Sequence, residues 1–369
     1  MAEVEPKIST YLHSKGARLG IPVSGSFELT RKCNFNCKMC YVHCTDTSKD
    51  NELTTEQWLT IAENAKKEGL LFLLITGGEP LLRPDFKELY AQFSKMGFMV
   101  SINTNGSLFN ESIFELFSEY PPARVNISLY GASDATYQSL CETEKFGTVI
   151  NNIRRIKAMG IPVRLNCVFN RYNIEDTQEI YRIANENNLI IKDTSYMYPP
   201  LRSKGQTGGN DARLSPEDAA KNTIFCRKLL YGEESLRSKA KEIMALHPPE
   251  CDPDAEGDGM RCRAGKSSFW VTYDGKMMPC GMLTHPSVSL LSSSFADAWQ
   301  QIRSETAEIR LPKECQSCYY KPICSVCAAM CYTETGRFNS KPDYICSMVK
   351  SMADEYVKLF GKDGEHNEN

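Results

Sequence analysis

Strand-length apolar segments alternate with helix-like segments along the first 200 residues of the chain. The segments predicted as strands are 26–30, 71–76, 99–104, 124–130, 162–169 and 191–198. The segments between them have apolar residues at helical spacing, and one opens with Thr54 and Gln57 in a capping-box pattern. Six successive strand–helix units imply a parallel sheet with right-handed crossovers. The sequence therefore predicts an α/β fold, a partial (β/α)6 TIM-like barrel, followed by a small cysteine-rich domain.

Composition and charge argue against several classes of function. Of the 369 residues, 41% are hydrophobic and 24% are charged, which is typical of a globular protein. The formal net charge is -3, so no basic excess favours binding to nucleic acid or to an anionic membrane. The N-terminus has no apolar signal segment, and the longest apolar run, 70–75, is far shorter than a membrane span. We therefore expect a cytoplasmic protein with no nucleic acid or membrane partner.

Sixteen cysteines are the unusual feature of this composition. Disulfides are rare in a reducing cytosol, so this number of thiols favours metal binding. Three cysteines lie within 33–40 with Cys44 just after them, and nine lie between 251 and 346. The remaining three are scattered between these groups: Cys141, Cys167 and Cys226. This distribution predicts two metal-bearing ends joined by a cysteine-poor scaffold.

The chain is predicted to have four parts. An acidic, proline-containing stretch precedes the second group of cysteines, and an amphipathic helix is expected near the C-terminus. The predicted bounds are 1–24 for an N-terminal extension, 25–225 for the barrel, 226–260 for a linker and 261–369 for the cysteine-rich domain.

Polar motifs follow the first four predicted strands. They are CNFNCKMC (33–40), GGEP (77–80), NTNG (103–106) and SLYG (128–131). In parallel α/β folds the chemistry lies beyond the carboxyl ends of the strands, which is where these motifs fall. NTNG or SLYG alone also fits an ordinary turn, whereas all four in succession indicate a site.

Three closely spaced thiols suggest an open metal site. A [4Fe-4S] cluster is ordinarily held by four thiolates, so three leave one iron open to a substrate or cofactor. The alternative is a zinc site with a distant fourth ligand such as His43.

The CxxxCxxC motif after the first strand, with GGEP after the second, resembles the radical S-adenosylmethionine (SAM) enzymes. The resemblance implies that Cys33, Cys37 and Cys40 hold a [4Fe-4S] cluster that binds SAM. It also implies that the GGEP residues receive the SAM ammonium group: Gly77, Gly78, Glu79 and Pro80. The polar positions that would face the ribose and carboxylate of SAM are Asn105 and Ser128, with Asn166 as a further candidate.

Two positions depart from the pattern of this family. Met39 stands where an aromatic residue usually faces adenine, although its polarizable sulfur also packs on rings. SLYG stands where relatives often have SLDG, which leaves the role of Tyr130 open.

The C-terminal cysteines resemble the SPASM extension of radical SAM enzymes, an iron-sulfur domain that holds two auxiliary [4Fe-4S] clusters. The candidate ligands are Cys262, Cys280, Cys315, Cys318, Cys324, Cys327, Cys331 and Cys346. A turn at Asp274 and Gly275 is expected to bring Cys262 and Cys280 together on paired strands. Two clusters need eight thiolates, whereas the region 251–346 offers nine.

The cluster count and the ligand set therefore stay open. Cys251 is the least certain ligand, and Cys327 and Cys331 compete for one position. A single cluster would correspond to the shortened twitch version of the domain. A zinc ribbon is the alternative, but only five residues separate Cys318 from Cys324.

The resemblance implies an enzyme whose 5′-deoxyadenosyl radical abstracts hydrogen from a peptide or protein, with a low-potential electron donor such as ferredoxin or flavodoxin. Oxidation of a small molecule and a non-catalytic electron-transfer protein are the alternatives. Sulfatase maturases carry an acid directly after the cysteine that matches Cys280, where this chain has Gly281. The sequence identifies neither the substrate nor a catalytic base.

Overall fold

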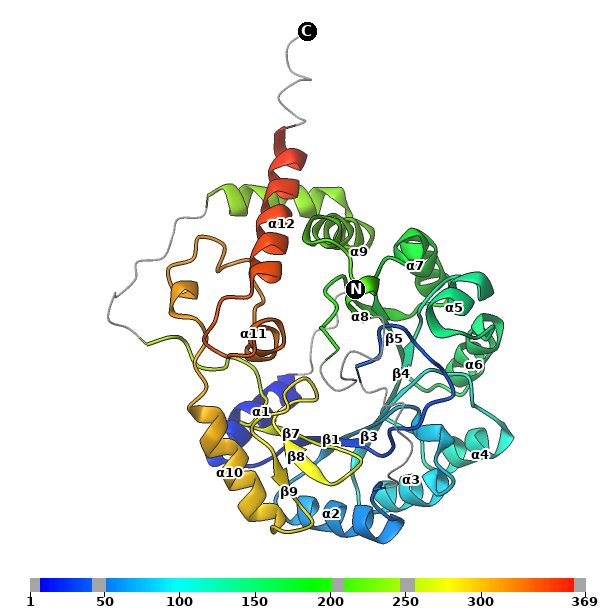
Figure 1. Ribbon diagram of the computed structural model, residues 1–369. Helices are drawn as coiled ribbons and strands as arrows, with labels where there is room; N and C mark the ends of the chain where they lie inside the picture. Colours follow the sequence, from blue (N-terminus) through cyan, green and yellow to red (C-terminus); the bar gives the residue numbers. More distant parts are fainter. Residues whose placement is uncertain (1–6, 42–50, 201–208, 246–255, 362–369) are drawn as a thin grey trace.

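The computed structural model describes residues 7–41, 51–200, 209–245 and 256–361. A nine-stranded sheet with the order β6-β5-β4-β3-β2-β1-β7-β8-β9 forms its centre (Figure 1). The strands are β1 (Ser24–Glu28), β2 (Phe72–Thr76), β3 (Met99–Thr104), β4 (Arg124–Ser128), β5 (Val163–Val168), β6 (Ile190–Thr194), β7 (Ser268–Val271), β8 (Lys276–Met278) and β9 (Val288–Ser289). β1 to β6 run parallel in sequence order, which confirms the predicted α/β partial barrel.

The helices are α1 (Lys7–Leu19), α2 (Thr55–Lys67), α3 (Phe86–Lys95), α4 (Glu111–Glu119), α5 (Asp134–Cys141), α6 (Phe146–Ala158), α7 (Thr177–Glu186), α8 (Gly209–Ala212), α9 (Pro216–Met244), α10 (Phe295–Ala307), α11 (Ala328–Thr335) and α12 (Asp343–Gly361). The helices from α2 to α7 lie on the outside of the curved sheet, whereas α11 and α12 lie away from the strands (Figure 1). The capping box predicted for α2 is present at Thr54 and Gln57. Phe27 of β1 packs against the rings of Trp58 and Phe93, so alternate residues of β1 face the helices.

The hairpin predicted in the C-terminal part joins the barrel sheet. β7 and β8 pair antiparallel around the turn at Asp274 and Gly275. β7 also pairs in parallel with β1 over four residue pairs, so the hairpin extends the barrel sheet on the side opposite β2. A Cβ at Gly25 would lie only 2.4 Å from the ring of Phe269, so the absence of a side chain at Gly25 lets β7 pack closely beside β1. The cysteine-rich part is thus bonded directly to the first barrel strand.

Sequence analysis missed α1, α5, α8, α9, α10 and α11. The consequence is largest for α9, because it fills most of the segment 226–260 that was expected to be a linker. Ser215 caps α9 and Pro216 stands at its first turn, which are both ordinary start signals. Gly232, with φ of 79°, interrupts the helix and so breaks its apolar periodicity. α9 packs along the predicted C-terminal helix, α12 (Figure 1).

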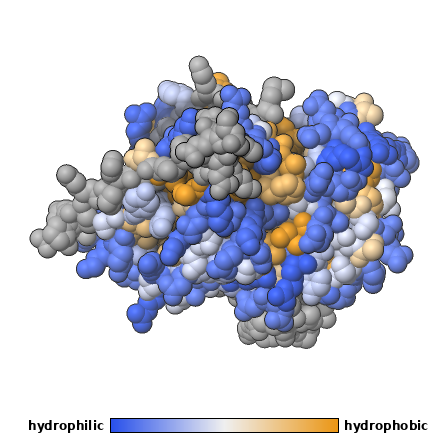
Figure 2. Space-filling view, turned by 90° about the horizontal axis from the view of Figure 1, so that it is seen from above, coloured by the Kyte–Doolittle hydropathy of each residue, from blue (hydrophilic) through white to orange (hydrophobic). Residues whose placement is uncertain are grey.

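The surface seen in Figure 2 has apolar side chains gathered near its middle, between hydrophilic regions. None of the helices in the described ranges has the length and the apolar character that a membrane crossing requires.

Candidate functional site

The first three cysteines lie on the loop that follows β1. Cys40 N–H donates to Cys37 O at 3.0 Å, and Phe35 N–H donates to the Cys33 thiol at 3.4 Å. Burial, and to a smaller extent the negative charges of Glu79, Cys37 and Cys40, raise the pKa of Cys33 to about 12. Thiols this close to one another ionise together only beside a compensating cation, which suits a metal cluster.

The GGEP loop after β2 is bonded backbone to backbone to the segment that leads from β1 to these cysteines. Gly78 N–H donates to Thr30 O at 2.7 Å, and Glu79 N–H donates to Lys32 O at 2.8 Å. A Cβ at Gly78 would lie 2.3 Å from Lys32 O and 2.6 Å from Arg31 O. Glycine is therefore required at position 78 by a close backbone approach.

Gly77 and Pro80 shape the same loop. Gly77 has φ of 153°, and a Cβ there would lie 2.5 Å from Thr30 O. Pro80 begins a short 3-10 helix, Pro80–Leu82, where its fixed φ suits the first position. The GGEP sequence is thus explained by local geometry before any ligand is considered.

Glu79 is fully buried, and its carboxylate joins this loop to the end of β3. It accepts hydrogen bonds from Leu81 N–H at 3.0 Å, Asn105 N–H at 2.7 Å and the Thr104 hydroxyl at 2.9 Å. Burial raises the pKa of Glu79 to about 7, and these hydrogen bonds lower it in part. Most of the acceptor positions of the carboxylate are therefore taken by the chain itself.

Asn105 connects the NTNG loop to the cysteine loop. Its side-chain amide donates to Asn34 Oδ1 at 2.9 Å and contacts the Cys33 sulfur at 3.9 Å. Its Oδ1 accepts from both the backbone N–H and the hydroxyl of Ser107. Asn105 thus lies beside the predicted cluster ligand, as the sequence predicts for a site residue.

Met39 also lies at this site, next to a residue that sequence analysis did not select. Asn170, fully buried on the loop after β5, donates its side-chain amide to Met39 Sδ at 3.3 Å. The Lys38 ammonium lies 4.4 Å from the ring centre of Tyr172 on the same loop. The only sequence signal for Asn170 was its place just beyond a predicted strand.

Cys141, at the end of α5, contacts the cysteine loop. Asn36 N–H donates to Cys141 O at 3.2 Å, and Lys38 N–H donates to Leu140 O at 3.0 Å. A hydrogen bond with the Cys141 thiol, together with burial, raises the pKa of Cys37 well above its ordinary value. Sequence analysis assigned no role to Cys141, because α5 was not predicted.

Ser128 and Asn166 lie side by side on β4 and β5, where they are direct register partners. Asn166 Oδ1 is buried and has no hydrogen-bond partner within the described ranges. Asn126, two residues before Ser128 on β4, donates to Asn103 Oδ1 at 2.9 Å. A buried acceptor without a hydrogen-bond donor lowers the stability of the fold. The position of Asn166 therefore suits a site in which a bound polar ligand donates to its Oδ1.

Four C-terminal cysteines form one group. Burial, and after it the charges of Cys324, Cys346 and Cys318, raise the pKa of Cys315 to about 11. Cys318 and Cys324 also raise the pKa of Cys346. These four thiols come from the loop 315–324 and from α12, and their number suits one four-iron cluster.

Cys327 and Cys280 lie on the side of this region that faces Tyr198. The Tyr198 hydroxyl is 3.8 Å from the Cys327 sulfur, and both cysteines raise the pKa of Tyr198. Cys331 is fully buried on α11. Cys262 is exposed before β7, and Cys280 follows β8, so these two flank the paired strands instead of lying on them.

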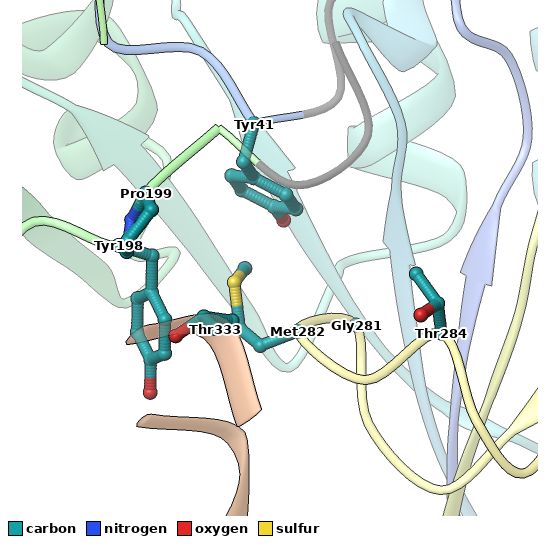
Figure 3. Close-up of a pocket in the computed structure, with 7 residues that line it drawn as sticks. All are labelled: Tyr41, Tyr198, Pro199, Gly281, Met282, Thr284 and Thr333. Carbon is teal, nitrogen blue, oxygen red and sulfur yellow. The ribbon is translucent and has the colours of Figure 1, made fainter. Parts of the chain in front are cut away.

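A small pocket lies between the two cysteine-bearing parts (Figure 3). Tyr41, which follows Cys40, lines it from the barrel side. Gly281 and Met282, which follow Cys280, line it from the hairpin side, and Tyr198 completes the wall near Thr333. Residues next to cysteines of both groups, Cys40 and Cys280, therefore line the same pocket.

Several predictions on metal ligands fall outside the described residues: His43, Cys44 and Cys251. Within the described ranges, no group of three or more His, Cys, Asp or Glu side chains is arranged to hold a metal ion. A four-iron cluster binds each thiolate through a different iron. The fit to such clusters rests here on the number of thiols, on their mutual proximity and on the buried Asn166 acceptor.

Comparison with known proteins gives a consistent result. Residues 27–184 match the family model described as "Radical SAM superfamily". The chain is 24% identical over 342 residues to an AdoMet-dependent heme synthase of Methanosarcina barkeri, covering 86% of this chain and 95% of that protein. It is 26% identical over 298 residues to the PqqA peptide cyclase of Streptomyces rochei, covering 78% of each.

The fold is shared with a solved protein of low sequence identity. Streptococcus suis SuiB, bound to the precursor peptide SuiA, superposes with a TM-score of 0.66 at 17% identity. The match covers 92% of this chain and 80% of SuiB.

We predict that Gly78→Ala destabilises the metal-free protein by about 2 to 3 kcal/mol, because the added Cβ separates two bonded backbone segments. Gly147→Ala on α6 is the matched control, since nothing lies within 4 Å of its Cβ position. It should be neutral or stabilising by up to about 1 kcal/mol. Chemical unfolding followed by circular dichroism measures both, and equal stability of the two variants would contradict the assigned role of Gly78.

We also predict slow alkylation of Cys315 in folded, metal-free protein at pH 8. A pKa of about 11 instead of 9.0 leaves roughly 100-fold less thiolate than in the urea-unfolded chain. Timed labelling with iodoacetamide and mass spectrometry of the peptides gives the rate, with the exposed Cys262 as reference. If Cys315 reacts equally fast in the folded and unfolded chains, the four thiols do not form the group described above.

Proposed function

Because the chain contains a radical SAM domain, we propose that it is an oxidoreductase that modifies a peptide or protein by radical chemistry, forming a cross-link or an oxidised residue. When bound, the [4Fe-4S] cluster and SAM supply a 5′-deoxyadenosyl radical that abstracts hydrogen from an unactivated carbon. The observation that carries the proposal is the three-cysteine loop after β1, because backbone hydrogen bonds hold the segment just before Cys33 against the GGEP loop.

The residues proposed to hold the first cluster are Cys33, Cys37 and Cys40. The GGEP backbone and the polar groups of Asn105, Ser128 and Asn166 would surround SAM, with Met39 beside the adenine. Glu79 would act mainly by fixing the GGEP loop, since three donors of the chain already bind its carboxylate. Such a site needs water excluded and the reacting atoms fixed, which these bonded loops favour.

For the auxiliary clusters we propose two ligand sets. Cys315, Cys318, Cys324 and Cys346 would form the first, as their mutual proximity supports. The second would contain Cys262 and Cys280 with either Cys327 or Cys331. We favour Cys327 for this position for two reasons. The Cys327 sulfur contacts the Tyr198 hydroxyl, and the charges of both Cys327 and Cys280 contribute, after burial, to the raised pKa of Tyr198.

A peptide substrate is supported by the similarity to PqqA peptide cyclase and by the fold shared with peptide-bound SuiB. A sulfatase-maturase type of reaction is disfavoured. A Cβ at Gly281 would lie 3.1 Å from the Trp270 ring, and the Trp270 indole N–H is fixed by Glu28 Oε2 at 2.9 Å. Position 281 therefore has little room for the acid found there in those enzymes.

A small-molecule substrate is the second candidate. The observation that favours it is the similarity to AdoMet-dependent heme synthase, which extends over 95% of that protein. Under either substrate the proposal includes a low-potential donor such as ferredoxin or flavodoxin, and a cytoplasmic location where the thiols stay reduced.

We expect Cys37→Ala to abolish formation of 5′-deoxyadenosine from SAM, because it removes one of the three ligands of the first cluster. Cys318→Ala should keep most of this uncoupled cleavage, since Cys318 lies in the C-terminal group. Anaerobically reconstituted proteins with SAM and a strong reductant, analysed by chromatography, give both rates. Equal loss in the two variants would contradict the proposed division between the two parts.

A further inference from the structure

A second cavity, of about 310 Å³, lies beside the last strand of the sheet, and none of its lining residues lines the pocket of Figure 3. One wall is the end of β6 with the residues after it, including Asp193 and Ser195. The other walls come from α9 and α12, with Leu230 and Met348 among their contributions. Neither the proposed cluster ligands nor the proposed SAM residues line this cavity.

β6 is the terminal strand of the nine-stranded sheet, with β5 as its neighbour. Phe169 N–H donates to Thr194 O at 2.8 Å, so Thr194 directs its backbone groups toward β5. Orientation alternates along a strand, and Asp193 therefore directs its backbone groups toward the outer edge. The cavity is lined from this side by Asp193 and Thr194 and by the two residues that follow β6, Ser195 and Tyr196, so it lies at the end of this strand edge.

The cavity has both apolar and charged walls. Met330, Met348 and Met352 give an adaptable apolar wall that can accept side chains of different shape. Arg227 lines another side and is held in place by a 2.5 Å hydrogen bond to the Tyr356 hydroxyl. Asp193 is partly buried next to Cys226, and burial together with the charge of Asp193 raises the pKa of the Cys226 thiol. An extended peptide with alternating side chains matches such a surface, because its main chain pairs with the edge while one side chain enters the cavity.

The cavity also lies next to the four-cysteine group. Ile323 and Ser325, which flank Cys324, line it, and so does Ile345, which precedes Cys346. A segment bound here would therefore lie along the boundary between the barrel and the C-terminal part. The occupant would be close to the reaction pocket without entering it.

We propose that an extended segment of the peptide substrate, outside the residue that reacts, pairs with the outer edge of β6 and places an apolar side chain in this cavity. The inference rests on the proposed function in taking a peptide as substrate. The docking itself requires no electron, no SAM and no bond formation, so it can be measured separately from the chemistry.

The test uses the reconstituted full-length protein without SAM or reductant. The probe is a positional-scanning library of fluorescein-labelled heptapeptides, acetylated at the N-terminus and amidated at the C-terminus. Fluorescence anisotropy should detect binding of sublibraries with Leu or Met fixed at one position. Hydrogen exchange should show that the amides of Asp193 and Ser195 exchange more slowly when these peptides are bound.

Leu230→Trp fills the cavity from α9 and should weaken binding at least about tenfold. Phe225→Trp is the matched control, because Phe225 lies on the same helix with the same exposure, 39%, and does not line the cavity. It should leave the affinity unchanged. The same peptides with N-methylated backbones should also lose affinity, since they cannot donate to the strand edge.

Three results would overturn the proposal: no sublibrary binds, Leu230→Trp binds as the parent does, or N-methylation has no effect. Protection of β6 that increases with protein concentration alone would instead identify a second copy of the chain as the occupant. Failure of docking together with normal 5′-deoxyadenosine formation would reject this site alone. Normal docking without that product would reject the proposed function and leave peptide binding.

Discussion

Two backbone hydrogen bonds between the β1 and β2 loops set the geometry of the whole site. Gly78 N–H to Thr30 O and Glu79 N–H to Lys32 O hold the GGEP loop against the chain just before Cys33. The Glu79 carboxylate then fixes the end of β3 to the same loop. The two loops approach closely enough for these backbone hydrogen bonds because position 78 has no side chain. The arrangement therefore depends on glycine at this position more than on any attractive side-chain contact.

The central place of β1 explains how two cysteine groups far apart in sequence come to lie on either side of one small pocket. β1 lies between β2 and β7 in the sheet, and the three loops that carry Cys40, the GGEP residues and Cys280 follow β1, β2 and the β7–β8 hairpin. The side chains of Phe27 and Phe269 pack together across the β1–β7 joint. The C-terminal part is thereby placed relative to the barrel by sheet hydrogen bonds, which are far more rigid than a linker would be.

Local patterns were sufficient to predict the barrel strands and the positions of Cys33, Glu79 and Asn105 at the strand ends, because strand period and turn residues are encoded within a few positions. They were insufficient for contacts between distant segments. The parallel pairing of β7 with β1 and the contact of Cys141 with Cys37 depend on tertiary packing. α9 was missed because Gly232 interrupts its apolar pattern and because its stability comes from packing against α12.

The charges of the site give a physical reason for its division into two parts. Burial, and after it the charges of neighbouring groups, raise the pKa of Cys33 to about 12 and that of Cys315 to about 11, so each thiol group favours the protonated state until a metal centre compensates the thiolates. If the two groups of thiolates lay side by side, their negative charges would also repel one another. The pocket lined by Tyr41 and Gly281 lies between the two cysteine-bearing parts, each of which needs its own compensating charge.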